Sequence, residues 1–540
     1  MRYSTLAAVL FTGLCSGAFA QQAPRVVSSA RPAGFTNLPR TAQNRPNFQG
    51  IWQAQGRAAY DLLDHPATHD MAPGKGVVVG GEIPYQPWAA AKKLENFANR
   101  KSADPLGNCY FPGVPRVMYL EFPFQIFQTS DHVAMIFEWS LVHRLIYTNG
   151  KPSLHEGIES WMGDARGRWE GDTLVVQVRD QNDKTWFDMA GNFHSDAIRV
   201  TERFTMLDAN TIQYEATIDD AKVFTKPWKI SVPLIRQTKM DRILEYQCQA
   251  EKEEADGSFE RDTRTWYPKA GSPPSTRPDF ATPPSPPANL PVLQPAANLR
   301  RTADGKPDLN GYYQADGGGA NYGIERHQQV FLMPAGRGIV VDPVDRLLPY
   351  QPWTRQERTD RELPHRGYDD QTAHCFPAGV PRAMYGPSPF QWLQTPNYVV
   401  ILFERMSWRV IPIIGPNQKW THIPDNVRLW QGDSVGHWEG DTLVVETTNL
   451  NGKSWLSEAG DVMSHAAHVV ERFVPTSDKK ITYRATVSDP IAYTRPWTIE
   501  VPLNREDEEL LEVACHEDNI DLQHLKDVRD EYRRQQKSGQ

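Results

Sequence analysis

The chain has 540 residues, with 58 basic and 66 acidic side chains, a formal net charge of −8 at pH 7 and a hydrophobic content of 39%. Single cores stop growing at about 250–300 residues, so this length predicts at least two domains, and a chain this hydrophobic is not expected to be disordered. The mildly acidic composition without a basic block argues against nucleic acid as a partner.

The first 20 residues, MRYSTLAAVLFTGLCSGAFA, have the pattern of a secretory signal peptide. Arg2 provides the positive charge, residues 6–18 form a short apolar stretch, and Ala18-Phe19-Ala20 is a small-x-small cleavage site. Later apolar runs fall short of the roughly 18 residues that a membrane helix needs. We therefore expect an exported protein, periplasmic or secreted, with no membrane span.

The remainder of the chain contains one sequence unit twice, because several phrases recur in the same order. They are PYQPW at 84–88 and 349–353, GVPR at 113–116 and 379–382, WEGDTLVV at 169–176 and 438–445, and ERF at 202–204 and 471–473. We expect a first β domain over 21–266, a second over 299–520 and a polar tail over 521–540.

Residues 267–298 lie between the units and contain ten prolines. This composition favours an extended, semi-rigid linker, since it cannot build a core. Its few apolar side chains would alternatively allow it to lie along one domain; they are Phe280, Leu290, Val292 and Leu293.

Nine short segments of the first unit have the composition and length of β-strands. They span 124–129, 132–139, 141–148, 166–169, 173–178, 200–206, 211–218, 228–233 and 243–248. EGD at 170–172 is typical of a hairpin turn. Helical patterns occur at 87–99 and, in the second unit, at 355–361. The expected fold class is mainly β, with two tandem antiparallel β-barrel or sandwich domains.

Four cysteines remain after the signal peptide, Cys109 and Cys248 in the first unit and Cys375 and Cys515 in the second. Four cysteines allow three pairings, and the equivalence of the units selects Cys109–Cys248 and Cys375–Cys515. Free buried thiols are the alternative. Since no CxxC occurs and no histidine cluster has the spacing of a metal motif, we expect no metal site.

The phrases KPDLNG at 306–311, PYQPW, GVPR, WEGDTLVV and KxWxxxAG at 184–191 and 453–460 resemble a large family of exported bacterial proteins for which no activity is established. The resemblance covers both units and implies an exported β-rich protein, but no reaction. A second resemblance is to lipocalin-like barrels, because GIW at 50–52 opens the first unit as G-x-W opens a lipocalin. The second unit has GYY at 311–313 and departs from that pattern.

The loop that follows the predicted hairpin gathers the strongest candidates for acid–base chemistry, because imidazole and carboxylate groups there could exchange protons near neutral pH. The candidates are His194, Asp188 and Asp196 in the first unit and His465 and Glu458 in the second, with Lys184, Trp186, Lys453 and Trp455 as ligand-binding neighbours. Met463 aligns with His194, so the imidazoles are out of register. The alternative interpretation is a loop anchored by its tryptophan.

Two further groups of charged residues lie on predicted strands and turns. Glu138 with Arg144, and Glu404 with Arg409, would form cross-strand ion pairs that either orient a polar ligand or are structural. The carboxylates that flank the glycine of each hairpin, Glu170 with Asp172 and Glu439 with Asp441, are turn formers rather than a glycosidase pair.

Three functions are compatible with these observations. The first is binding of a small hydrophobic or aromatic molecule in the barrel mouths, without a cofactor. The second is a cofactor-independent isomerase, hydratase or lyase that uses the histidine–carboxylate loops. The third is a carbohydrate- or surface-binding structural module with two weak sites. The sequence predicts a small-molecule ligand, and it does not specify an oligomeric state.

Overall fold

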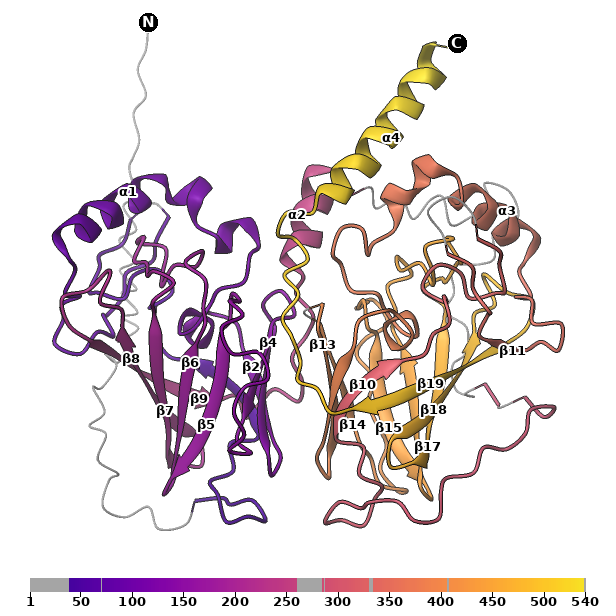
Figure 1. The fold of residues 1–540 in the computed structure, drawn as a ribbon, viewed down its shortest axis with the longest axis horizontal. Coiled ribbons are helices and arrows are strands. Elements are labelled where there is room, and N and C mark those ends of the chain that lie inside the picture. The colour runs from indigo at the N-terminus through magenta and orange to yellow at the C-terminus, as the bar shows by residue number, and fades with distance from the viewer. Residues whose placement is uncertain are drawn as a thin grey trace, which may run out of the picture.

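The computed structural model describes residues 38–68, 70–259, 284–285, 287–329, 334–405 and 407–538. The expected signal peptide lies outside these residues, and so does most of the proline-rich segment. Two β-barrel-like sheets stand side by side (Figure 1) and form a mainly β protein. The predicted fold class is therefore confirmed, and of the two architectures expected it is the barrel that forms.

The first sheet is a closed barrel in which each strand pairs with the next along the chain and the last pairs with the first. Neighbouring strands are antiparallel except β4 and β5, which meet in a parallel bridge at Tyr147 and Arg166. The strands are β1 (Gly50–Ala54), β2 (Phe124–Gln128), β3 (His132–Phe137), β4 (His143–Tyr147), β5 (Asp164–Glu170), β6 (Thr173–Arg179), β7 (Arg199–Asp208), β8 (Thr211–Asp219) and β9 (Trp228–Arg236).

The second sheet repeats this order, with β14 and β15 at its two ends and a parallel bridge between Ile413, next to β14, and Gly436 of β15. A short extra strand, β11 (Val340–Asp342), pairs with β19. The other strands are β10 (Gly311–Ala315), β12 (Phe390–Gln394), β13 (Tyr398–Phe403), β14 (Ser407–Pro412), β15 (Asp433–Glu439), β16 (Thr442–Thr448), β17 (His468–Ser477), β18 (Lys480–Ser488) and β19 (Trp497–Glu506).

Side chains fill both barrels. Alternate residues of strands such as β9 face a continuous cluster of buried apolar groups. Trp52 and Tyr214 are fully buried in the first cluster, as Trp392 and Tyr483 are in the second. The packing therefore gives no support for a ligand site in the barrel interiors, below the barrel mouths in which the first functional hypothesis places it.

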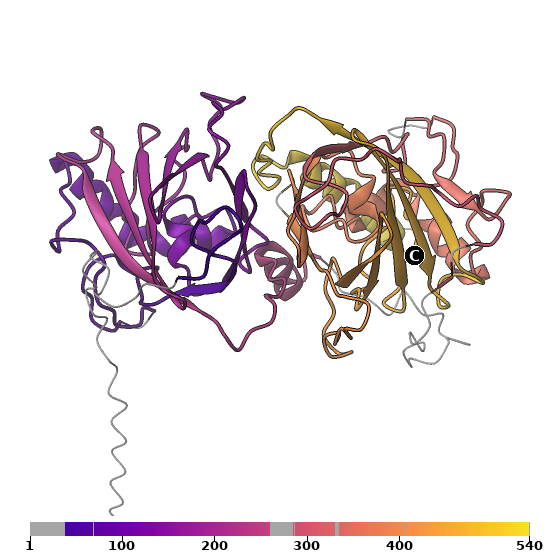
Figure 2. The same ribbon diagram turned by 90° about the horizontal axis from the view of Figure 1, so that it is seen from below.

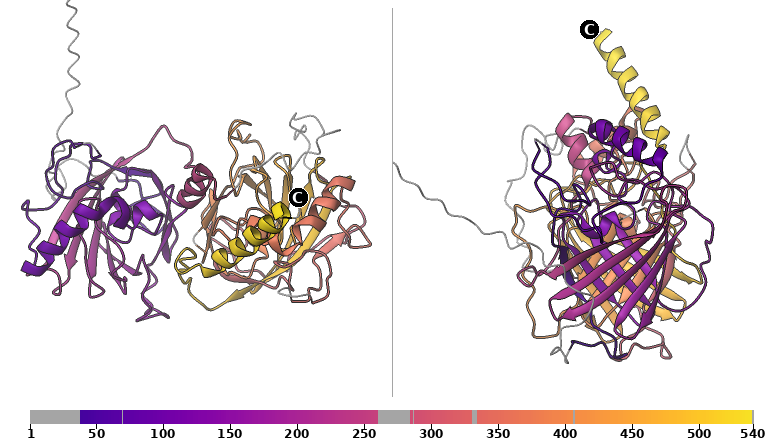
Figure 3. Two further views of the ribbon diagram at one scale, coloured as in Figure 1. Left: turned by 90° about the horizontal axis from the view of Figure 1, so that it is seen from above. Right: turned by 90° about the vertical axis from the view of Figure 1, so that its left-hand side faces the viewer.

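Four helices lie outside the barrels. α1 (Pro87–Ala103) and α3 (Pro352–Arg361) lie at the same end of their barrels, α2 (Cys248–Asp256) lies between the barrels, and α4 (Ile520–Ser538) projects from that end (Figures 1 and 3). Short 3-10 helices occur at η1 (Leu106–Asn108), η2 (Arg116–Tyr119), η4 (Pro364–Asp369) and η5 (Arg382–Met384). Within the described ranges, no helix is both long and apolar enough to cross a membrane.

One prediction about the elements is wrong. The segment 243–248 is not a strand, because Ile243 packs in an apolar cluster shared with the second barrel and the helix α2 begins at Cys248. The polar tail, for which no conformation was predicted, is the helix α4, which has side-chain pairs four residues apart, such as Lys526 with Asp530.

Both predicted disulfides are confirmed, Cys109–Cys248 and Cys375–Cys515, with partners separated by 139 and 140 positions in the sequence. Each attaches the segment that follows the last strand to its own barrel. We call these the first crossing segment (237–259) and the second crossing segment (507–519), because each also packs against the other barrel. In Figure 1 the second passes between the barrels toward α4.

The barrels contact each other through equivalent residues on both sides. His143 Nε2 lies 2.9 Å from the carbonyl of Phe403, and Trp408 Nε1 donates to the carbonyl of Phe137 at 3.1 Å. Between these contacts lies an apolar cluster built by both domains, with Ile51, Phe127, Ala134, Ile136, Leu141, Ile243, Leu393, Val400, Leu402 and Trp408. Figure 2 shows the barrels side by side with α2 against this junction.

The described part of the linker lies along the second barrel, as one of the two alternatives proposed. Arg484 Nη1 donates to the carbonyl of Pro291 at 3.0 Å, and the Ala296 N–H donates to the carbonyl of Pro475 at 3.0 Å. Val292 is 80% exposed, so polar contacts rather than this side chain hold the segment.

Candidate functional site

The three acid–base candidates of the first loop are not brought together. His194 is buried, with Nδ1 3.0 Å from the carbonyl of Ser195 and Nε2 2.6 Å from the Thr185 hydroxyl, and burial lowers its pKa. Asp188 is buried elsewhere in the loop, and Asp196 forms a surface ion pair with Lys222 at 2.6 Å. The imidazole therefore stabilises the loop and does not face either carboxylate.

Asp188 fixes a second loop to the end of the first barrel. Its carboxyl group accepts the backbone N–H groups of Leu62 and Asn192. Burial is the largest cause that raises its pKa, to about 7, and Asp61 adds to the effect. In the second unit the carboxylate stands at the other position, because Ser457 is equivalent to Asp188 and Asp461 to Asn192. The Ser457 hydroxyl donates to the Asp461 carboxylate at 2.6 Å.

The second loop does not join its two candidates either. Glu458 accepts a hydrogen bond from Asn321 at 2.7 Å. The carbonyl of His465 accepts one from Arg428, and burial lowers the pKa of the His465 ring. Trp186 and Trp455 are buried, so the alternative interpretation of a loop anchored by tryptophan is confirmed.

The two candidate lysines contact the crossing segments. Lys184 pairs with Glu517 and its ammonium lies 5.9 Å from the ring centre of Trp161, while Lys453 pairs with Glu254 at 2.6 Å. They therefore join the domains and do not gather around a pocket in the barrel mouth.

The predicted pair of Glu138 with Arg144 is wrong, because Arg144 points into the barrel and pairs with Glu202 of β7 at 2.6 and 3.1 Å. Tyr214 donates to the same carboxylate at 2.8 Å. Glu138 instead accepts the backbone N–H of Leu244 at 3.1 Å. A barrel brings strands that are distant in sequence to face one another, so spacing along the chain favoured the wrong partner.

The second barrel has the same arrangement. Arg409 pairs with Glu471, with Nη1 to Oε1 at 2.9 Å, and Tyr483 donates to that carboxylate at 2.8 Å. Glu404 instead accepts the backbone N–H of Leu511 and the Tyr312 hydroxyl, both at 3.3 Å. The repeated ERF phrase contained both missed glutamates.

The hairpin carboxylates lie at the exposed tips, as predicted for turns. Asp172 pairs with Arg40 at 2.9 Å and Asp441 with Arg301 at 2.8 Å. Glu170 pairs with Arg203 at 3.0 Å and Glu439 with Arg472 at 2.7 Å. Of these residues, none lines any of the pockets described below.

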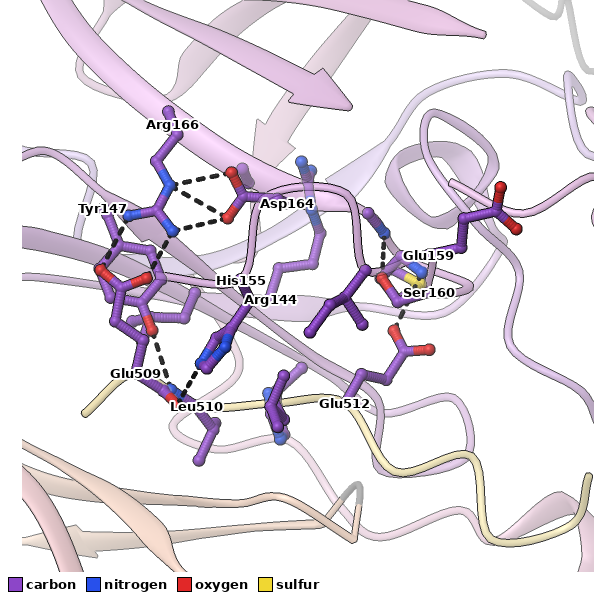
Figure 4. Close-up of a pocket in the computed structure, with 17 residues that line it drawn as sticks. Arg144, Tyr147, His155, Glu159, Ser160, Asp164, Arg166, Glu509, Leu510 and Glu512 are labelled. Atoms are coloured by element: carbon purple, nitrogen blue, oxygen red, sulfur yellow. Dashed lines mark hydrogen bonds and ion pairs between the residues drawn. The ribbon is translucent and has the colours of Figure 1, made fainter. Parts of the chain in front are cut away.

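A pocket of about 110 Å³ lies between the first barrel and the second crossing segment (Figure 4), and we call it the first interdomain pocket. Its charged groups satisfy one another: Arg166 contacts both Asp164 and Glu509, at 2.7 and 2.6 Å. The Tyr147 hydroxyl accepts the Leu510 N–H at 3.1 Å. These contacts hold the crossing segment and leave few polar groups for a ligand.

The equivalent second interdomain pocket, about 60 Å³, lies between the second barrel and the first crossing segment. Its walls include Trp408, Trp420 and Tyr398. Gln431, which is 2% exposed, lines it, and neither atom of its carboxamide has a hydrogen-bond partner among the described residues. The equivalent residue of the first pocket is Met162, which is apolar.

One glutamate of each crossing segment lines the pocket that the segment covers, and its carboxyl group accepts backbone N–H groups from two consecutive residues of the other barrel. Desolvation raises the pKa of Glu245 to about 8 and that of Glu512 to about 7. The donors are Trp430 and Gln431 for Glu245, and Trp161 and Met162 for Glu512.

Across the part of the chain that the structure covers, no three His, Cys, Asp or Glu side chains are placed to hold a metal ion. Both ring nitrogens of His65 contact backbone carbonyls, and His69 lies outside the described residues. Comparison of the chain with known protein families, with curated proteins and with solved structures gives no match.

Proposed function

We propose that the chain is an exported protein that binds a small aromatic molecule in the second interdomain pocket. The observation that carries this proposal is the buried Gln431 carboxamide without a hydrogen-bond partner in the described structure. A buried polar group left unsatisfied costs about 1–3 kcal/mol, and a ligand with a complementary edge would remove that cost. Two disulfides are consistent with an oxidising compartment and so with export.

The equivalent position in the first unit supports a ligand-binding role for this amide. Met162 fills that position in the first pocket, so the fold accepts an apolar side chain there. Three aromatic side chains line the second pocket together with polar and charged residues, and small-molecule sites combine these two kinds of group. Its enclosed volume of about 60 Å³ is smaller than the cavity of about 150 Å³ that holds benzene, so a single small ring would be enclosed only in part.

The test uses 2-pyridone, a single ring whose N–H donor and carbonyl acceptor are adjacent and so match a carboxamide. We expect it to quench tryptophan fluorescence of the full chain, because Trp408 and Trp420 line the pocket. Gln431→Met should abolish the quenching and raise the free energy of unfolding by about 1 kcal/mol. Met162→Leu in the first pocket is the control. Equal binding by Gln431→Met would contradict the proposal.

Glu245 favours a second candidate function, proton transfer to a bound ligand. Its pKa of about 8 leaves the carboxyl largely protonated at neutral pH, so it could act as an acid beside Gln431. If the ligand is turned over, the rate should fall as the pH rises past 8, and Glu245→Gln should abolish turnover while binding persists. Persistent turnover in that variant would exclude this role.

A further inference from the structure

Corresponding ends of the two barrels are filled differently. In the first, Phe122, Trp139 and Tyr246 form an aromatic cluster with ring centres 5.2 to 5.3 Å apart. The three equivalent positions of the second barrel hold Ser388, Arg405 and Val513, so no ring occupies them.

The backbone establishes this equivalence. Pro-Phe-Gln follows both Phe122 and Ser388 in the sequence. The N–H of Tyr246 donates to the carbonyl of Glu138 at 3.3 Å, and the N–H of Val513 donates to the carbonyl of Glu404 at 3.0 Å. These hydrogen bonds place the three positions alike in the two domains, although the sequence from Arg405 to Arg409 is one residue shorter than that from Trp139 to Arg144.

Replacement of the rings leaves a pocket of about 60 Å³ in the second domain, which we call the Arg405 pocket. Its apolar walls are Phe376, Phe403, Pro377, Pro387 and the disulfide of Cys375 with Cys515. Arg405 lines this pocket and donates from Nη2 to Cys515 Sγ at 3.1 Å, its one hydrogen bond to the described residues. Arg405 is an exposed residue, so its other donors are open to solvent or to a ligand.

The deeper arginine of the pocket is already neutralised. Arg382 holds Asp370 with two bonds of 2.9 and 3.0 Å and donates to Asn321 and to the carbonyl of Trp455. The first domain repeats this pair with Arg116 and Asp104. The charge that distinguishes the second domain is therefore that of Arg405.

We propose that the Arg405 pocket binds a small carboxylate that carries an apolar group. The guanidinium would pair with the carboxylate through two parallel N–H donors, and the apolar group would lie against Phe376 and Phe403. This site is separate from the pocket beside Gln431, and neither proposal depends on the other. Glu458 interacts electrostatically with Arg405 and weakens the attraction, so Glu458→Gln should tighten binding.

The experiment measures benzoate binding to the full chain by calorimetry. Arg405→Gln should weaken binding at least tenfold. Ser388→Phe combined with Arg405→Trp and Val513→Tyr should abolish it, because these side chains rebuild the cluster of the first domain. Since that cluster packs in the same frame, we expect the triple variant to fold with an undiminished melting temperature. Arg179→Gln, an exposed position of the first barrel, is the control.

Benzamide and acetate separate the two parts of the recognition. Benzamide lacks the charge and acetate lacks the ring, so each should bind at least tenfold more weakly than benzoate. Benzoate binding should also weaken as ionic strength rises. The proposal is overturned if the unmodified chain does not bind benzoate, or if the folded triple variant binds it as tightly.

Discussion

Glu245 and Glu512 hold protons that an exposed glutamate would release at neutral pH. Desolvation at the domain junction raises the pKa values to about 8 and about 7, whereas an unfolded chain has a glutamate pKa near 4.5. Between the unfolded-state pKa of about 4.5 and the folded-state values of about 7 and 8, the folded chain binds more protons than the unfolded chain. The stability that these groups contribute is therefore full below about pH 4.5 and is lost progressively as the pH rises from there through 7 and 8.

This predicts a measurable change in the pH dependence of unfolding. Replacement of Glu245 by Gln keeps an acceptor for the backbone but removes the titration. The free energy of unfolding should then fall less steeply between pH 5 and pH 8, by at most about 1.4 kcal/mol per pH unit. Denaturant titrations at pH 5, 7 and 9 measure it, and Glu82→Gln is an exposed control. An unchanged slope would show that Glu245 releases its proton at an ordinary pH.

Single residues also set the limit of what the sequence could predict about the site. The four cysteines could be paired because the repeat removed the ambiguity. Gln431 could not be singled out, because a glutamine in a loop carries no local signal and its isolation depends on a crossing segment nearly 200 residues away. Its alignment with Met162 was the available clue, since an exchange of Met for Gln at equivalent positions is unusual in a core.

At the scale of secondary-structure elements, a buried ion pair inside the second barrel joins strands that are not hydrogen-bonded to each other. Arg409 on β14 and Glu471 on β17 are both buried, so removal of one partner leaves a buried charge without compensation. Arg409→Met should lower the free energy of unfolding by about 3–5 kcal/mol. The double variant with Glu471→Leu should lose less than the sum of the single variants, as a double-mutant cycle would reveal.

The exposed pair of Arg301 with Asp441 provides the matched control for this cycle. Arg301→Met should cost less than about 1 kcal/mol, because water solvates the remaining carboxylate. Equal costs at the two positions would mean that the barrel interior is hydrated rather than dry.

Strand positions were predictable where alternation and turn signals coincide, as in the hairpin of β5 and β6. They were not predictable where apolar residues serve a contact between domains. Isoleucine favours β-strands, yet the side chain of Ile243 packs in the apolar cluster that both domains build. The helix α4 was missed although Leu522, Leu525, Val528 and Tyr532 recur every three to four residues, because the segment is otherwise polar and charged.

At the scale of the whole molecule, the two barrels depend on one shared apolar cluster. Val400 is fully buried there, so Val400→Asp should separate the barrels while each disulfide keeps its own barrel intact. We expect a larger radius of gyration in small-angle scattering and two unfolding transitions in calorimetry. Val292→Asp on the exposed linker is the control, and an unchanged radius for Val400→Asp would contradict the prediction.

The reciprocal crossing segments have a consequence for ancestry. Each unit contributes the same arm to the other, as the subunits of a twofold dimer do. A chain with one unit could make these contacts with a second copy of itself, and the proline-rich segment would then be a later covalent join. After fusion, the two contact surfaces are encoded separately, so they no longer need to have identical residues. Such a fusion would explain why equivalent positions differ, as Met162 does from Gln431 and Trp139 from Arg405. In each pair the residue of the first unit serves packing, and the residue of the second unit is available for a new chemistry.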